Sequence, residues 1–246
     1  MRKEKGFTLI ELMIVIAIIA IIAAIAIPGL LNSQRASNER NASGSLKTLG
    51  TAQSDFRSND RDNNRIQDFW VGDVAGLYCI DNTNVLAGGV ATPIKLIEVS
   101  IALADITVGG PGCTVTQPPG NNYAVAAAPT YGTMSAKAGY WYMALTADLQ
   151  WGANTGTAGT YATNTGNTTE AKHNTSRFGV AAMYESYGSS GNKSFILNEG
   201  NTMFKRDFGA DVLVVGGAPP PTLNVAVFDG NWPLDATLAA NWGKMD

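Results

Sequence analysis

The chain has 246 residues, a formal net charge of −3 at pH 7 and only 15% charged residues. The sequence shows no basic patch, which argues against nucleic acid as a partner. After the first ~55 residues about 190 remain, enough for one domain with its own core. Abundant Gly, Thr, Asn and Ala with sparse charge favour an exported, β-rich domain with long loops.

The chain opens with a basic cluster followed by a long apolar run. Three basic residues among the first five are offset only by Glu4. The run that follows, residues 7–31, would reach about 37 Å as an α-helix, against ~30 Å for a hydrocarbon core. Because such a basic cluster tends to stay cytoplasmic, the pattern predicts one membrane-spanning helix with the rest of the chain exported.

A secretory signal peptide and an ordinary membrane anchor are two simpler interpretations of this run. The sequence Ala24-Ile25-Ala26 would serve as a cleavage site, but the run exceeds the ~7–15 apolar residues of a signal peptide. Glu11 fits neither interpretation, because a charged residue within a membrane span is costly and rare unless it has a partner. Because Glu11 lies near the end of the run, its carboxylate could approach the membrane–water interface and escape part of this cost.

The residues "GFTLIE" after a short basic leader resemble the N-terminus of type IV pilins and type II secretion pseudopilins. The resemblance extends over about residues 5–31. It implies that prepilin peptidase cuts after Gly6 and methylates the new N-terminus at Phe7. Glu11 then becomes the fifth residue of the mature chain, and Pro28 and Gly29 fall where family members often have a helix break.

The resemblance also implies a partner for Glu11. In this family the glutamate is thought to meet the N-terminal ammonium of a neighbouring subunit during filament assembly. Removing one partner of a buried ion pair is strongly destabilising, so such a pair would favour a packed neighbour over a lone subunit. It would also fix the axial register, which apolar side chains alone would not.

A helical pattern resumes beyond Pro28. Apolar residues recur in steps of three or four at Ala42, Leu46, Leu49, Ala52 and Phe56, which indicates one buried helix face. We therefore expect one long helix over residues 6–58. Its first half would lie in the membrane or filament core, and its second half would pack on a folded head.

The segment after this helix contains acids at calcium-loop spacing. Asp60, Asp62, Asn64 and Asp68 stand where positions 1, 3, 5 and 9 of such a loop would be. However, Arg65 replaces the required glycine and Val71 the bidentate glutamate. A calcium site is one hypothesis, and a solvated turn rich in Asp and Asn is the other.

Cys79 and Cys113 are the two cysteines. Export would place them where disulfides persist. A bridge would close a loop of about 34 residues and stabilise the fold by about 3.8 kcal/mol in the chain-entropy model. We expect the bridge, with two buried thiols as the alternative.

The head is predicted to be an antiparallel meander that resembles the sheet of pseudopilin heads. Strands are expected over 139–148, 177–186, 193–200 and 201–209, with a further strand around Leu223–Phe228. The apolar spacing of residues 94–104 slightly favours a helix. The fold class is thus α+β: a long N-terminal helix on an antiparallel β-sheet head.

The expected organisation divides the chain into four parts. Residues 1–6 form the leader, 7–31 the membrane or filament-core helix, 32–58 its continuation into the head, and 59–246 the exported head. The low-complexity stretch 152–176 is predicted to be a surface insertion.

The sequence contains no enzyme motif in a suitable context. His173 is the only histidine, and its polar surroundings predict a surface residue. Tyr140, Trp141 and Tyr142 would form either a sugar-binding or filament-contact patch or, more simply, part of the core.

These observations favour a structural, non-catalytic subunit of a type IV pilus or type II secretion pseudopilus. The expected partners are prepilin peptidase, other pilin or pseudopilin subunits and the bacterial inner membrane. The chain would cross that membrane once, with a cytoplasmic N-terminus and an exported head, before entering a filament at the cell surface. A minor or tip subunit acting as an exported binding module is the alternative, and an enzyme on a membrane anchor is a third. The sequence does not separate motility, secretion and DNA-uptake filaments.

Overall fold

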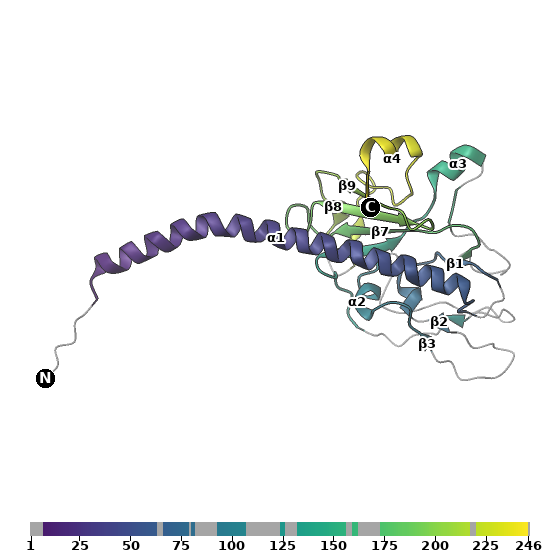
Figure 1. The fold of residues 1–246 in the computed structure, drawn as a ribbon, viewed down its shortest axis with the longest axis horizontal. Coiled ribbons are helices and arrows are strands. Elements are labelled where there is room, and N and C mark those ends of the chain that lie inside the picture. Colours follow the sequence, from purple (N-terminus) through teal and green to yellow (C-terminus); the bar gives the residue numbers. More distant parts are fainter. Residues whose placement is uncertain are drawn as a thin grey trace.

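The structure, a computed structural model, describes residues 7–62, 66–78, 80–81, 93–106, 124–125, 132–155, 159–161, 173–216 and 220–245. Its architecture is the predicted one, a long N-terminal helix followed by an antiparallel β-sheet head. The helix projects far beyond the head at its N-terminal end (Figure 1).

A single helix, α1 (Leu9–Ser58), runs through both halves of the molecule, with Thr8 as its N-cap. It is continuous through Pro28 and curves gently along its N-terminal half (Figure 1). Proline lacks the N–H that would bond the carbonyl of Ala24, which accounts for curvature in this region. The helix predicted over residues 6–58 is confirmed from Leu9 to Ser58.

The C-terminal half of α1 packs into the head along the predicted stripe. Its apolar members are at most 4% exposed: Ala42, Leu46, Leu49, Ala52 and Phe56. This face contacts strands of the main sheet and a short strand beside it. Burying such side chains contributes about 1.5–3 kcal/mol each for the larger ones, so this half of α1 is an integral part of the head.

The main sheet has five antiparallel strands in the order β12-β9-β8-β7-β5. Their bounds are β5 Tyr140–Ala144, β7 Gly179–Tyr184, β8 Lys193–Asn198, β9 Met203–Asp207 and β12 Gly243–Met245. The predicted meander is therefore confirmed for β7, β8 and β9, and β5 forms within the predicted segment 139–148. The α1 stripe lies against β7 and β8.

The aromatic residues of β5 fill the core. Tyr140, Trp141 and Tyr142 are at most 2% exposed, and β5 is an inner strand, since β7 pairs with one edge and residues 104–106 bond to the other. Burial raises the pKa of Tyr142 to about 12, so its hydroxyl stays protonated at neutral pH. The simpler of the two predictions for this run is thus correct.

Short elements complete the head. The strands are β1 Phe69–Trp70, β2 Ile80–Asp81, β3 Pro93–Ile94, β4 Ala124–Val125, β6 His173–Asn174, β10 Leu213–Val214 and β11 Thr222–Leu223. The helices are η1 Ala75–Tyr78, a 3-10 helix, with α2 Val99–Ala102, α3 Leu149–Thr155 and α4 Asp235–Asn241. The short strands pair as β1-β6, β10-β11 and β3-β2-β4.

Two local predictions were wrong. The strand expected around Leu223–Phe228 ends at Leu223, because the next residues turn back with the N–H groups of Val227 and Phe228 bonded to the Asn224 carbonyl. The stretch 152–176 is not wholly a surface insertion, since Tyr161 is 2% exposed and β6 pairs with β1. Residues 94–104 contain a helical turn, α2, as the spacing favoured.

The two glycines in the head half of α1 give a matched test of this packing. A methyl group on Gly44 would have no heavy atom within 4 Å, whereas one on Gly50 would lie 3.0 Å from Leu197 Cδ2 and 3.1 Å from Asn201 Oδ1. Gly44→Ala should raise the free energy of unfolding by about 1 kcal/mol, because alanine favours the helix. Gly50→Ala should be the less stable variant, because the side chains of Leu197 and Asn201 must give way to admit the methyl.

Thermal unfolding of the detergent-solubilised full chain, followed by near-UV circular dichroism, measures both variants as monomers. Equal gains in stability would show that the side chains of Leu197 and Asn201 make room for the methyl at no cost.

Candidate functional site

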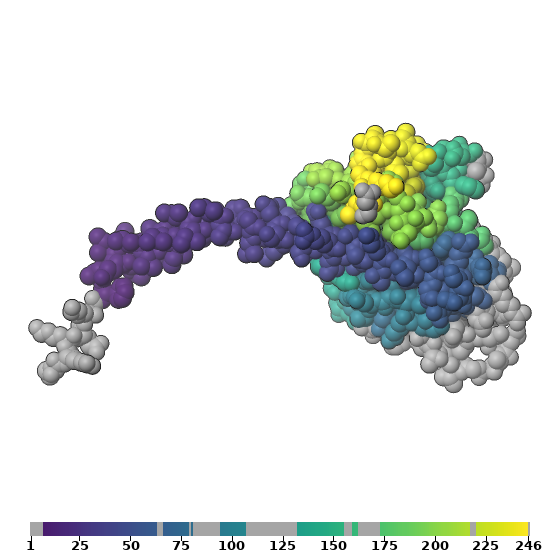
Figure 2. Space-filling model, in the orientation of Figure 1, coloured from purple at the N-terminus to yellow at the C-terminus, as the bar shows by residue number. Residues whose placement is uncertain are grey.

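The N-terminal half of α1 is an exposed apolar surface. Every large apolar side chain of residues 7–31 is at least 45% exposed, from Leu31 at 45% to Phe7 at 84%. Figure 2 shows this segment as a rod that stands clear of the head. Of the residues that the structure describes, α1 alone has a window long and apolar enough for a membrane span, and none of that window is buried. So large an apolar surface requires lipid or neighbouring protein around it.

Glu11 belongs to the cap of this helix. Its carboxylate accepts hydrogen bonds from the Thr8 N–H at 2.9 Å and the Thr8 hydroxyl at 2.7 Å, while Thr8 Oγ1 accepts from the Glu11 N–H at 3.4 Å. This is a reciprocal capping box. The carboxylate is therefore held at the first turn of the helix, where the macrodipole favours negative charge.

The predicted cleavage point lies just ahead of the helix. Phe7 is described and 84% exposed, and Phe7 and Thr8 precede the first helical residue, Leu9. Gly6 lies outside the described residues. The predicted Cys79–Cys113 bridge also falls on residues outside the described part of the chain.

At the opposite end of α1, two of the predicted calcium ligands meet the single histidine. Asp62 and Asp68 are 2% and 1% exposed, and His173 is 1% exposed. His173 Nδ1 lies 3.1 Å from Asp68 Oδ1 and 3.8 Å from Asp62 Oδ2. One potential ligand atom from each residue lies within 4.8 Å of the other two. We call these three residues the Asp–His cluster.

The other predicted calcium ligands do not join this group. Asp60 has a positive φ of 45° in the turn after α1 and is not among the three clustered donors. Asn64 lies outside the described residues. The turn is held by Arg61, which donates to Asp55 at 2.8 and 3.0 Å and thereby lowers the pKa of that carboxyl.

His173 was predicted to lie on the surface, and that prediction was wrong. Its strand β6 pairs with β1, which places His173 opposite Trp70. The imidazole lies edge-on to the Trp70 ring, with centroids 5.2 Å apart, and 6.1 Å from the Phe56 ring. Two-residue strands that pair across 100 positions leave no periodic signal in the sequence, so the polar neighbours of His173 were misleading.

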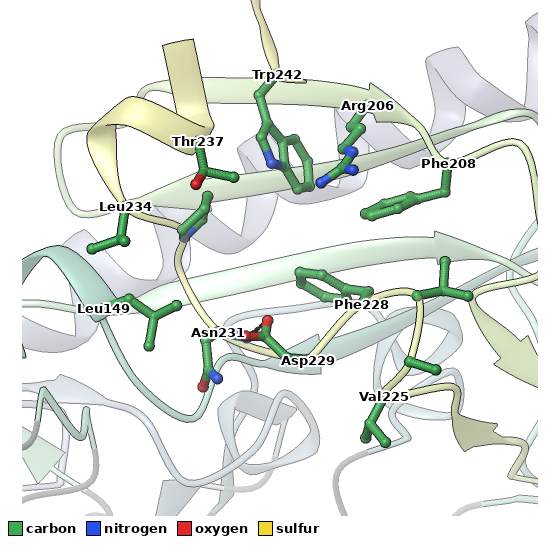
Figure 3. Close-up of a pocket in the computed structure, with 13 residues that line it drawn as sticks. Leu149, Arg206, Phe208, Val225, Phe228, Asp229, Asn231, Leu234, Thr237 and Trp242 are labelled. Carbon is green, nitrogen blue, oxygen red and sulfur yellow. Dashed lines mark hydrogen bonds between the residues drawn. The ribbon is translucent and has the colours of Figure 1, made fainter. Parts of the chain in front are cut away.

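A pocket of about 350 Å³ lies on the side of the head formed by β9, α4 and the segment before α4. Its wall includes Phe208, Phe228 and Trp242, with Arg206, Asp229 and Asn231 among the polar groups (Figure 3). The Arg206 guanidinium lies 4.4 Å from the centre of the Phe208 ring. The indole N–H of Trp242 is buried without a hydrogen-bond partner among the described residues.

Comparison with known proteins concerns the N-terminal part of the chain. Residues 1–27 match the family model of the prokaryotic N-terminal methylation motif. Over 67 residues the chain is 51% identical to the type IV major pilin protein PilA of Myxococcus xanthus (strain DK1622). The matched region covers 27% of this chain and 29% of that protein. No solved structure matches.

These matches confirm the resemblance that "GFTLIE" indicated. The N-terminal segment carries a pilin-type methylation motif, and the architecture behind it is pilin-like. The chain spans less than a third of the length of the curated relative that it matches. The similarity therefore concerns the N-terminal region of the chain, and the rest of the head is described by its own structure.

Proposed function

We propose that this protein is a structural subunit of a type IV pilus or type II secretion pseudopilus, and not an enzyme. The observation that carries the proposal is the division of α1 into two halves. One half is exposed and apolar from residues 7 to 31, and the other is the core of the head. A subunit that moves from a membrane into a helical filament needs such a helix, because lipid and neighbouring helices can cover the same surface in turn.

The proposal includes processing at the membrane. The basic leader would stay cytoplasmic and the head would be exported. Prepilin peptidase would cut between Gly6 and Phe7 and methylate Phe7. The exposed, non-helical position of Phe7 and Thr8 supports this, because a peptidase needs an extended and accessible segment.

Within the filament, Glu11 would pair with the N-terminal ammonium of a neighbouring subunit. The capping box supports this role, because it holds the carboxylate at the very end of the apolar surface, near the new N-terminus. Apolar contacts between helices are tolerant of sliding, whereas an ion pair in a water-poor bundle has one best position. The pair would therefore set the axial register of the subunits.

A second candidate function is a minor or tip subunit that acts as an exported binding module. The pocket beside Trp242 favours it, because aromatic walls and the Arg206 cation converge there (Figure 3). Pockets that bind small ligands combine apolar walls with a few placed polar groups in this way. The two functions differ in whether the chain builds filaments alone.

Processing predicts a defined mass. The exported protein should begin at Phe7 and carry one added methyl group, which intact-mass and N-terminal peptide mass spectrometry would detect. Gly6→Val, which places a branched side chain at the cut, should leave the full-length chain in the membrane. A mature N-terminus at Ile27 would instead support the signal-peptide interpretation.

Glu11→Ala should leave processing and membrane insertion intact but reduce filament yield at least tenfold. Insertion loses a charged residue and so should not suffer, whereas the neighbour's ammonium would be left without its counter-charge. Glu11→Gln should behave alike, because it keeps the size and loses the charge. Sheared filaments and membrane-retained protein are quantified from cells that carry the assembly machinery.

The matched control for Glu11 is Glu98→Gln. Glu98 is an exposed head carboxylate that pairs with Lys137 at 3.0 Å, so its loss should leave filament yield unchanged. Wild-type amounts and lengths of filament in Glu11→Ala would disprove the pairing.

The subunit proposal predicts that this chain, as the sole pilin supplied to a compatible assembly system, forms filaments. Electron microscopy of sheared material and the composition of those filaments give the result. Filaments that appear only when another pilin is present, with this chain scarce and terminal, would favour the binding-module function.

A further inference from the structure

We propose that the Asp–His cluster is a binding site for a divalent metal ion of the zinc class. The inference does not depend on the filament proposal. It concerns a place in the head where three segments meet, namely the turn after α1, the residue before β1, and β6. These segments contribute Asp62, Asp68 and His173 respectively.

The geometry brings three donor atoms to one point. His173 Nδ1 lies 3.1 Å from Asp68 Oδ1 and 3.8 Å from Asp62 Oδ2, and no pair of the three exceeds 4.8 Å. Around a tetrahedral zinc ion with ligands at ~2.0–2.1 Å, donor atoms lie about 3.3 Å apart. The observed spacing needs only small side-chain adjustments to reach that arrangement.

The donor atoms of the cluster also suit a cation. Two carboxylates and one imidazole lie at 2% exposure or less, beside the Phe56 and Trp70 rings. His173 Nδ1 lies within hydrogen-bond distance of Asp68 Oδ1 but beyond that distance from Asp62 Oδ2. A metal ion would accept electron pairs from all three donors.

The donor set selects the kind of metal. Calcium takes six to eight oxygen ligands in a flexible shell, whereas an imidazole nitrogen with two carboxylates suits zinc and similar first-row ions. With the histidine included, the expected ion for the acids after α1 changes from calcium to zinc or a similar first-row metal. Three protein donors leave a fourth position open for water or another ligand.

Such an ion would act as a clip inside the head. It would join the end of the membrane-type helix to the β1-β6 pair and close the long chain segment between Asp68 and His173. Cross-links that close long loops gain the most stability from reduced chain entropy. Because the ion binds only the folded head, stability should rise with metal concentration.

The experiment uses the full processed chain in detergent, first freed of metal with a chelator. Zn²⁺ should bind with one equivalent per chain in isothermal titration calorimetry and raise the unfolding midpoint by about 5–10 °C at a hundredfold excess over Kd. Ca²⁺ at the same excess over the chain should raise it by less than 1 °C. Co²⁺ should give the visible absorption of a tetrahedral site, which reports the ligands directly.

Variants separate this site from other metal binding. Asp62→Asn and His173→Gln should weaken Zn²⁺ binding at least tenfold and abolish the Co²⁺ absorption. Asp60→Asn is the matched control, because Asp60 lies in the same turn outside the cluster and asparagine also tolerates its positive φ. It should bind Zn²⁺ as the wild type does.

Several outcomes would overturn the proposal. They are no Zn²⁺ binding by the wild type, a wild-type Co²⁺ spectrum without tetrahedral bands, tighter binding of Ca²⁺ than of Zn²⁺, or unchanged binding in His173→Gln. The Co²⁺ spectrum is recorded on the wild type, so it decides the matter even if a cluster variant fails to fold. In each of these cases the cluster would be either a hydrogen-bonded group that binds no metal or a calcium site with oxygen ligands.

Discussion

The packing of one helix into two different environments is the constraint on which the rest of the structure depends. The stripe from Ala42 to Phe56 is as buried as any part of the head, while the apolar window at the N-terminal end of the same helix is not buried by any part of the chain that the structure describes. Because α1 is continuous between these parts, the head cannot fold without fixing the direction of the apolar segment. A rigid projection, not a flexible tether, is thus presented to lipid or to neighbouring subunits.

Local periodicity predicted the elements that carry this constraint. The stripe at Ala42, Leu46 and Leu49 repeats at helical spacing, and the apolar segments of β7, β8 and β9 are joined by short turns, so neighbours in sequence are neighbours in the sheet. The pairing of β1 with β6 is of another kind. Each strand has two residues and the pair spans more than 100 positions, so only the assembled core brings them together. No window of the sequence contains that information.

The candidate sites follow the same division. The sequence Thr8-x-x-Glu11 contains a capping-box signal, so the hydrogen bonds of Glu11 are predictable from sequence. From the sequence, Glu11 was interpreted only as a charge within an apolar run. At the other end of α1, the spacing of Asp62 and Asp68 pointed to metal binding with oxygen ligands. The third donor of the proposed site is His173, which lies in a polar stretch far along the chain. A local motif was therefore extended by a residue that only tertiary structure supplies.

A polar residue inside the apolar stripe connects α1 with the Asp–His cluster. Gln53 is 1% exposed, and its amide bonds both backbone groups of Trp70, accepting from the N–H at 3.0 Å and donating to the carbonyl. A buried amide that lost these bonds would carry a large desolvation cost, so β1 has one register on α1. That register places Asp68, the residue before β1, against His173 across the β1-β6 pair. The helix that would build the filament therefore also positions the Asp–His cluster.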